Sequence, residues 1–418
     1  MSAAGLDHAL SIIKTLRDAG HEALLAGGCV RDMLMNHEPS DYDVATDATP
    51  EVVMSLFRRT IPVGVSFGVV RVLGPKGIGE VEVATFRSDG EYRDGRRPES
   101  VTFGNARDDA MRRDFTINGM FYDPIAKEVI DYVGGRDDLS RRVIRAIGNP
   151  RERFAEDKLR LLRAIRFASR LEFAIEPETW DAIVEMAPEV TQVSVERITQ
   201  EWRRMIVDRR RAIAMTLARD AGLIAAILPE LEAVADRPVS TFEGDGTTWS
   251  VTLDILRWLP DWSPDGPSFP LAMAALMHRI EPFEAVDEVA RRLKLSTEER
   301  GRIVWLVLRI ESLWEVSRGT RARLKRLLGE PGIEDLLALG TAVGQVIRRD
   351  IRQVDFLRYY LRDQPDGPIN PPPLISGRDL IEAGLKPGPE FSAILDRVRD
   401  AQLEGTIATK DEAIALAK

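Results

Sequence analysis

The spacing of apolar residues changes near residue 145, and this change limits the possible folds more than any other feature of the sequence. Before it, short alternating or valine-rich stretches typical of strands are mixed with helical patterns, whereas beyond it nearly every apolar pattern is helical. We therefore predict an α+β head with a mixed sheet and helices, followed by an all-α remainder. Because 418 residues exceed what one hydrophobic core usually serves, we divide the chain into a head (1–144), a neck (145–235), a body (236–345) and a tail (346–418).

Strand candidates in the head are short and are separated by turn or helix signals. They are Ala23 to Ala26, Asp41 to Ala45, Phe67 to Leu73 and Glu80 to Phe86. Gly27-Gly28 follows the first candidate and precedes a predicted helix from Val30 to Met35, which gives a strand, a glycine turn and a helix. A second helix is expected from Thr49-Pro50 to about Arg59, because proline favours the first position of a helix. The charged, glycine-containing stretch 89–98 is expected to form a mobile loop.

Three carboxylates of the head are expected to converge. Residues i and i+2 of a strand face the same side of a sheet, so Asp41 and Asp43 should point together, with Glu82 beside them from another strand. Such a cluster is costly unless a hard cation neutralises it, and Mg²⁺ prefers carboxylate, water and phosphate oxygens. We predict a two-metal Mg²⁺ site on Asp41 and Asp43, of the kind that stabilises the attacking and the leaving oxygen of an in-line displacement.

The Gly27-Gly28 turn and Arg31 are predicted to hold phosphate. Without a side chain, glycine lets the backbone approach a phosphate closely, and the following helix begins with free N–H groups, near which Arg31 adds a positive charge. Each signal is weak by itself, since Asp-x-Asp on an exposed strand and Gly-Gly in a tight turn are both common. Their combination in one domain indicates a site for a nucleoside triphosphate.

Charge and composition restrict the partners. The net charge is −9, yet ten Arg or Lys accompany three Asp or Glu between Arg141 and Arg170, and further arginines cluster at 318–326 and 348–362. A phosphate-rich ligand would find these patches, although arginines on helices commonly form solvated ion pairs instead. The single cysteine, Cys29, excludes an internal disulfide and a multi-cysteine zinc site, and the sequence contains no apolar run of eighteen residues. We expect a cytoplasmic protein with no membrane segment and no stable protein partner.

Four motifs identify the family that the chain resembles. They are LLAGGCVRD (24–32), DYDVAT (41–46), RRDFTING (112–119) and EDKLRLLRAIRF (156–167). The chain resembles class II tRNA nucleotidyltransferases and bacterial poly(A) polymerases nearly continuously over about residues 10–231. Further along, ISGRDLIEAGLKPGPEF looks like the tail of longer members. The resemblance implies a DNA polymerase β-like head followed by a helical neck, body and tail, with tRNA gripped along the helical part.

The same resemblance implies roles for individual residues. The catalytic carboxylates fall on Asp41 and Asp43, and Glu82 lies where the wider superfamily places a third carboxylate. Arg112 lies in the motif associated with ribose recognition, together with Arg113 and Asp114. The residues that would contact the nucleotide are Gly27, Gly28, Arg31, Arg113, Asp114, Asp157, Arg160, Arg163 and Arg166.

Asp157 and Arg160 match the pair with which the family selects the incoming base. One helical turn apart, a carboxylate acceptor and a guanidinium donor would lie on one face of a helix. Cytosine and adenine each offer an amine to the carboxylate and a ring-nitrogen acceptor to the guanidinium, whereas guanine and uracil present the opposite polarity. Arg163 and Arg166 would continue this face towards the phosphates. An exposed i, i+3 ion pair is the purely structural alternative.

Two further features bear on the expected activity. The loop at 89–98 corresponds to the family's flexible loop, which is tied to addition of the terminal A and is lacking in CC-adding relatives. Relatives often carry a metal-dependent phosphohydrolase region from about Trp249, but here Val251 and Arg279 stand in its ligand motifs. Since valine cannot bind a metal and arginine would repel one, we expect a helical body without that activity, and His278 as a packed or surface residue.

The resemblance implies a reaction and leaves alternatives open. The reaction is addition of the 3′-terminal CCA, or of its terminal A alone, to tRNA, using ATP and CTP with Mg²⁺ and releasing pyrophosphate. Bacterial poly(A) polymerase activity is an alternative of the same class. A catalytically inactive RNA-binding adaptor is an alternative of another class, and the intact set of Asp41, Asp43 and Arg113 speaks against it.

Overall fold

The structure is a computed structural model that describes residues 2–64, 67–90, 101–239, 246–261, 266–315, 319–365 and 367–418. The chain forms two compact units, each described by itself below. The first consists of Met1–Met205 and Ile213–Ile227, and the second of Ile206–Ala212 and Leu228–Lys418. None of the described helices combines the length and the apolar character needed to cross a membrane.

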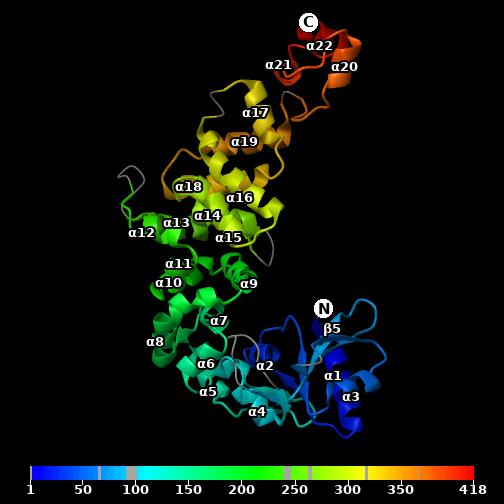
Figure 1. Cartoon of the computed structure of the whole chain (residues 1–418), viewed down its shortest axis with the longest axis vertical. Coiled ribbons are helices and arrows are strands. Elements are labelled where there is room, and N and C mark those ends of the chain that lie inside the picture. The colour runs from blue at the N-terminus through cyan, green and yellow to red at the C-terminus, as the bar shows by residue number, and fades with distance from the viewer. Residues whose placement is uncertain are drawn as a thin grey trace. The chain divides into compact units, whose positions relative to one another are not determined.

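A seven-stranded mixed sheet organises the first unit (Figure 1). Its strands lie in the order β3 (Thr60–Gly64), β4 (Val69–Leu73), β5 (Glu80–Thr85), β2 (Asp43–Thr46), β1 (Ala23–Ala26), β8 (Phe121–Asp123) and β9 (Glu128–Ile130). Neighbouring strands are antiparallel except β2 and β5, which run parallel. A separate ribbon pairs β6 (Arg87–Asp89) with β7 (Val101–Phe103). The predicted mixed sheet is therefore confirmed.

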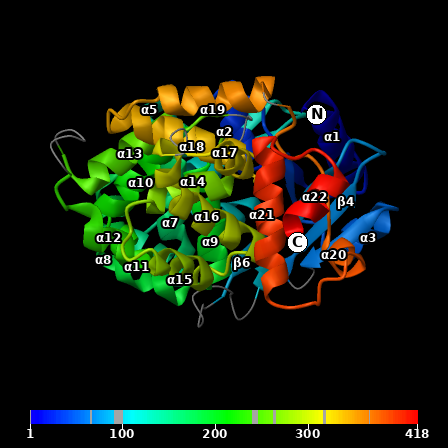
Figure 2. The same cartoon turned by 90° about the horizontal axis from the view of Figure 1, so that it is seen from above.

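Helices cover both faces of this sheet. On one face, α1 (Ser2–Asp18) and α3 (Pro50–Leu56) pack on a core that includes Leu25 and Val83 (Figure 2). On the other face, α4 (Ala106–Met111) packs with Leu24 and Phe86. Successive residues of a strand point to opposite faces, so a central strand covered on both sides must be apolar throughout. All four residues of β1 are accordingly buried.

Glycine and proline positions explain where two helices near the candidate site begin. Helix α2 (Gly28–Leu34) begins directly after β1, at a turn in which Gly27 has φ 74°. Thr49 is the N-cap residue of α3, as predicted, and Pro50 is its first residue, although the Thr49 side chain donates or accepts no capping hydrogen bond. Helix α3 ends at Leu56, earlier than expected, and β3 follows it. A short 3-10 helix, η2 (Thr116–Asn118), lies before β8, and α5 (Gly135–Arg141) packs on η2.

The neck part of the first unit is mostly helical, as predicted. Its helices are α6 (Pro150–Glu156), α7 (Leu159–Leu171), α8 (Pro177–Met186), η3 (Ala187–Gln192), α9 (Val195–Ile206), α10 (Arg211–Asp220) and α11 (Leu223–Ile227). The prediction missed one small feature: β10 (Val143–Ile144) pairs in parallel with β11 (Ala174–Ile175). Two-residue strands leave no periodic signal in a sequence.

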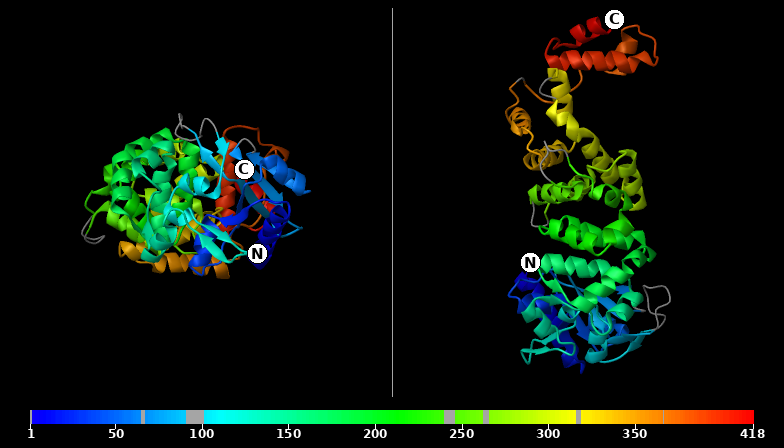
Figure 3. Two further views of the ribbon diagram at one scale, coloured as in Figure 1. Left: turned by 90° about the horizontal axis from the view of Figure 1, so that it is seen from below. Right: turned by 90° about the vertical axis from the view of Figure 1, so that its left-hand side faces the viewer.

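The second unit is helical in every part that the structure describes. Its helices are α12 (Pro229–Ala235), α13 (Thr248–Trp258), α14 (Phe269–Met277), α15 (Glu284–Arg292), α16 (Thr297–Arg309), η4 (Ile310–Trp314), α17 (Arg321–Leu328), α18 (Ile333–Val346), α19 (Arg352–Asp363), α20 (Gly377–Glu382), α21 (Glu390–Glu404) and α22 (Lys410–Ala417). Apolar α14 is buried against α13, α16 and α18. The last three helices share a small core of their own around Leu380 and Val398 (Figure 3).

Candidate active site

Asp41, Asp43 and Glu82 lie together at one end of the parallel strand pair. Asp43 is the first residue of β2 and pairs in register with Glu82 of β5. Asp41 lies two residues before β2 instead of within it, and accepts a hydrogen bond of 2.7 Å from the Ser40 hydroxyl. Partial removal from water, with the negative charges of Asp41 and Glu82, raises the pKa of Asp43 to about 6. The charges of Asp41 and Glu82 therefore both act on Asp43.

The three carboxylates differ in exposure and partners. Asp41 and Asp43 are exposed, and the Arg71 Nε donates to Glu82 Oε1 at 3.1 Å. Among the residues that the structure describes, no three His, Cys, Asp or Glu side chains are arranged to hold a metal ion by themselves.

Arg113 connects the carboxylates to the glycine turn. Its positive charge opposes the rise in the pKa of Asp43. A Cβ atom added at Gly27 would lie 2.8 Å from Arg113 Nη1, and Gly27 also has a positive φ, so both space and backbone conformation require glycine there. The turn and the guanidinium therefore occupy one crowded corner beside the carboxylates.

A buried carboxylate, which the sequence analysis did not identify, fixes the positions of Arg112 and Arg113. Asp109 of α4 is fully buried and accepts hydrogen bonds from both Arg112 (2.9 and 2.6 Å) and Arg113 (3.1 and 2.8 Å). Burial alone would raise the pKa of Asp109, but the two guanidinium charges lower it below its usual value. The i, i+3 and i, i+4 spacing was the signal that could have identified Asp109.

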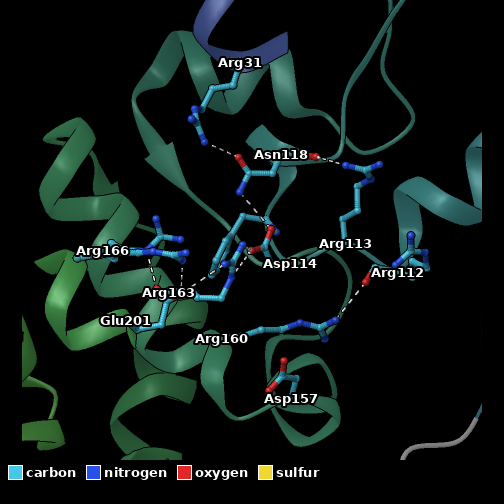
Figure 4. Close-up of polar contacts among 12 residues, drawn as sticks. Arg31, Arg112, Arg113, Asp114, Asn118, Asp157, Arg160, Arg163, Arg166 and Glu201 are labelled. Carbon is cyan, nitrogen blue, oxygen red and sulfur yellow. Dashed lines mark hydrogen bonds and ion pairs between the residues drawn. The ribbon is translucent and has the colours of Figure 1, made fainter. Parts of the chain in front are cut away.

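Asn118 is the centre of a polar network between the head and the neck (Figure 4). Its side-chain oxygen accepts from Arg31 Nη1 at 2.7 Å, its amide donates to Asp114 Oδ1 at 3.1 Å, and its carbonyl accepts from Arg113 at 3.4 Å. Asp114 Oδ2 in turn accepts from Arg163 of α7 at 2.9 and 2.7 Å. Asn118 lies within the RRDFTING motif but had no role in the sequence analysis.

Burial and charge fix the protonation of this network. Burial would raise the pKa of Asp114, but the Arg163 charge and the hydrogen bonds from Asn118 and Arg163 lower it to about 2. Asp114 is therefore ionised at neutral pH. Its two oxygens are held between the head motif and the neck helix, which fixes the position of Arg163.

Arg163 and Arg166 share a second buried carboxylate, Glu201 of α9. Arg166 Nε lies 2.6 Å and Arg163 Nη1 3.7 Å from the Glu201 oxygens. Burial, together with the charges of Arg163 and Arg204, lowers the pKa of Arg166 to about 10 despite Glu201. The Phe167 ring lies 4.3 Å from the Arg166 guanidinium carbon and 5.3 Å from that of Arg163, distances at which cations interact with an aromatic face.

Asp157 and Arg160 do not share a helix face, which corrects the sequence analysis. The expected continuous helix is broken, because α6 ends at Glu156 and Asp157 has the extended conformation φ −146°, ψ 101°. Arg197 of α9 donates to both Asp157 oxygens, at 3.1 and 2.7 Å, and the Leu159 N–H donates to the same carboxylate at 3.1 Å. These contacts hold Asp157 in place, and no local pattern indicated a partner forty positions away.

Arg160 lies in α7, after the break, and is held by three hydrogen bonds. Its Nη1 donates to the Arg153 carbonyl at 2.7 Å and to the Glu156 carboxylate at 2.6 Å, and its Nη2 donates to the Arg112 carbonyl at 3.1 Å. Arg160 thus contacts the same motif that contains Arg113 and Asp114. Figure 4 shows these arginines and Asp114 of the head and neck in one region of the first unit.

Other predicted features lie elsewhere. Residues 91–98 of the expected loop lie outside the described residues. His278 is buried at the end of α14, with its Nδ1 2.8 Å from the Ala275 carbonyl oxygen and its Nε2 3.3 Å from the Arg279 Nε. The expected lack of phosphohydrolase activity stays a prediction.

Comparison with known proteins gives the family. Residues 23–145 match the family model described as "Poly A polymerase head domain", and residues 172–234 match "Probable RNA and SrmB- binding site of polymerase A". A CCA-adding enzyme of Lactobacillus delbrueckii subsp. bulgaricus is 31% identical over 415 residues, which is 97% of this chain and 96% of that protein. The chain belongs to the CCA-adding enzyme family. The predicted family is thereby confirmed.

Other members of the CCA-adding enzyme family resemble the chain over part or nearly all of its length. The enzyme of Geobacillus stearothermophilus is 46% identical, but over 218 residues, which span only about half of each protein (52% and 53%). The crystal structure of the Bacillus stearothermophilus CCA-adding enzyme in complex with CTP has a TM-score of 0.78 and 30% identity, covering 99% of this chain and 96% of that one. This likeness also confirms the predicted fold class, an α+β head with a mostly helical remainder.

Proposed function

We propose that the chain is a nucleotidyltransferase that adds nucleotides of the 3′-terminal CCA to tRNA, without a nucleic-acid template, and works in the cytoplasm. The observation that carries this proposal is the placement of Asp41 and Asp43 beside Glu82, next to Arg113 and the Gly27 turn. Membership of the CCA-adding enzyme family supports it. In the proposed reaction, the 3′-hydroxyl oxygen of the RNA bonds to the α-phosphorus of ATP or CTP, pyrophosphate leaves, and the hydroxyl proton is released.

Asp41 and Asp43 are proposed to hold Mg²⁺. Two exposed carboxylates supply the hard oxygen donors that this ion prefers, and the raised pKa of Asp43 indicates negative charge that a cation would neutralise. When bound, Mg²⁺ would supply positive charge to the attacking hydroxyl oxygen and the leaving pyrophosphate. Glu82, one strand away, would add to the negative field that retains the ion. Activity without any divalent ion would contradict this part of the proposal.

The glycine turn and two arginines are proposed to hold the nucleotide. The Gly27 N–H already donates to the Met120 carbonyl oxygen at 3.1 Å, so the Gly28 N–H at the start of α2 would face the triphosphate, and neither glycine has a side chain that blocks the approach. Arg113, fixed by Asp109, would contact the ribose and phosphates from the carboxylate side. Arg31, fixed by Asn118 and Asp32, would add positive charge from the turn of α2.

Asp157 and Arg160 are proposed to select the base. A carboxylate has about four lone-pair sites, and the N–H groups of Arg197 and Leu159 use three at Asp157, so one remains for the amine of adenine or cytosine. Arg160 uses three of its five N–H donors on Arg153, Glu156 and Arg112, so two remain for the ring nitrogen. The partners within the chain would therefore orient the pair while leaving the groups that recognise the base.

Nucleotide addition to defined tRNA ends tests the function. We expect tRNA without CCA to take up two C and one A, tRNA ending in C to take up C and A, and tRNA ending in CC to take up A alone. UTP and GTP should give little product. Uptake of A only, on tRNA ending in CC, would restrict the function to terminal A addition.

Two other outcomes would replace the proposed function. Long A tails on arbitrary RNA would assign the chain to the poly(A) polymerases, whose head-domain family model it matches. Binding of tRNA without incorporation of any nucleotide would identify an inactive adaptor.

A further inference from the structure

A cavity in the second unit has five cationic side chains among its fourteen lining residues. It has a volume of about 630 Å³ and lies where the end of α16, the helices α17 and α21, and residues 369–370 meet. Its cationic residues are Arg309, Arg323, Lys325, Arg326 and Arg399, and its acidic residues are Glu330 and Asp400. Known small-molecule sites have volumes of roughly 300–1,000 Å³. The cavity therefore has the size of a small-molecule site and a surplus of positive charge.

Acidic residues neutralise only part of this surplus. Arg326 is paired with Asp400, to which its Nε donates at 2.6 Å, and with Asp396 at 3.3 Å, and Arg323 lies 3.7 Å from Glu315. Arg399 donates to the side-chain oxygens of Gln402 and Asn370, which are both uncharged amides. Removal from water and the charge of Arg326 lower the pKa of Arg399, which indicates that an anion would be favourable beside it.

The wall of the cavity combines a buried cationic group with apolar side chains. Lys325 is only 5% exposed, and its Nζ lies 3.2 Å from the Pro368 carbonyl oxygen, so a cationic group lies in the wall of the cavity and not on an open surface. Ile369 and Leu403, both buried, provide apolar wall beside the charged groups. A mixed wall with several N–H donors suits a small ligand that carries phosphate, because guanidinium groups bind phosphate with two parallel hydrogen bonds.

We propose that this cavity is a second phosphate site, in which Lys325, Arg323 and Arg399 bind a small phosphate-bearing solute such as pyrophosphate or a nucleotide. It involves none of the residues assigned to the proposed nucleotidyl transfer. Its walls come from segments that are about seventy residues apart in the chain, Arg323 and Lys325 on α17 and Arg399 on α21. A bound anion would therefore connect α21 to α17 and stabilise their packing.

Titration of the full chain with pyrophosphate, followed by calorimetry in a buffer with a metal chelator, tests the proposal. We compare the unchanged protein with Arg399→Gln and with the control Arg397→Gln, an exposed arginine on the same helix that does not line the cavity. The head site is the same in all three proteins, so a difference between them reports on the cavity. The expected result is pyrophosphate affinity on the order of tenfold weaker in Arg399→Gln and unchanged in Arg397→Gln.

A second cavity variant and a measurement of tRNA affinity complete the experiment. Arg323→Gln changes an exposed residue, whose nearest acidic partner Glu315 is 3.7 Å away, and should weaken pyrophosphate binding without unfolding the protein. Equal affinity of the unchanged protein and both cavity variants would overturn the proposal. A loss of tRNA affinity without any change in pyrophosphate binding would also overturn it, because these arginines would then bind RNA phosphates. Since the titration involves no catalysis, the result is independent of the proposed nucleotidyl transfer.

Discussion

At the scale of single residues, the charge of Asp43 decides how the head behaves without metal. Its pKa of about 6 lies above the ordinary value of an aspartate because of desolvation and the charges of Asp41 and Glu82. A carboxyl group whose pKa is higher in the folded than in the unfolded chain destabilises the fold once it ionises. The destabilisation is absent below about pH 4, grows as the pH rises to about 6, and is complete above that.

Asp43→Asn should therefore raise the melting temperature of the metal-free protein at pH 7.5 and leave it unchanged near pH 4. The rise should be small, about 1 to 2 °C, because the exposed side chain is partly screened by solvent. Thermal denaturation in a metal chelator measures it, with Asp181→Asn, an exposed residue of α8, as the control. A lower melting temperature at pH 7.5 would contradict the position of Asp43 in a negative cluster.

Asn118→Ala tests the network between the head and the neck. The substitution leaves the buried Arg31 and Asp114 each without one hydrogen-bond partner, and such a loss costs about 1–3 kcal/mol. We expect a loss of unfolding free energy in this range and a higher KM for ATP, because Arg31 is no longer oriented. Urea denaturation and steady-state kinetics measure the two effects. An unchanged KM would show that Arg31 does not hold the nucleotide.

At the scale of elements, the break between α6 and α7 is the feature on which base selection depends. Asp157 has an extended conformation, and Arg197 of α9 donates to both oxygens of its carboxylate. The Leu159 N–H donates to the same carboxylate. Arg197→Ala would leave the Asp157 carboxylate without its charged partner. Its oxygens could then turn away from the base.

We expect Arg197→Ala to lower kcat/KM for ATP and CTP by about tenfold, since loss of a charge-assisted contact typically costs that much or more. Discrimination against UTP and GTP should fall as well. Arg170→Ala, an exposed arginine of α7, is the matched control and should be unaffected. Equal loss for all four nucleotides would show that Arg197 supports the fold and not base selection.

The sequence predicted four of the head's strands, β1, β2, β4 and β5, but not the others. A short apolar run, a valine-rich stretch and period-two alternation predicted β1, β4 and β5 almost to the residue. The three-residue strands β8 and β9 were missed because three residues show no period, and their pairing depends on contacts with β1 and with each other.

The site was predictable where its residues are close in the sequence. Asp41 and Asp43 are two positions apart, although Asp41 lies before β2, whereas Glu201 and Arg197 act on residues more than thirty positions away. Local patterns carry no information on such pairings. The same reason explains the wrong prediction of a continuous helix through Asp157, which the long-range contact with Arg197 holds extended.

At the scale of the whole molecule, basic regions accompany a negative net charge of −9. If RNA binds through arginine and lysine, its affinity depends on released counterions, not on the net charge. We expect tRNA affinity to fall by at least about tenfold between 50 and 200 mM salt. Filter binding or fluorescence anisotropy measures it, with a short RNA hairpin for comparison. An affinity independent of salt would contradict binding through phosphate contacts.

Asp41 and Asp43 are proposed to be essential for nucleotide transfer. Incorporation of labelled ATP and CTP into tRNA without CCA by the unchanged protein, Asp41→Asn and Asp43→Asn tests this role. We expect CCA addition by the unchanged protein and a loss of about a thousandfold or more in both variants, with tRNA affinity within about tenfold because phosphate contacts dominate affinity. Incorporation by either variant at the rate of the unchanged protein would contradict it.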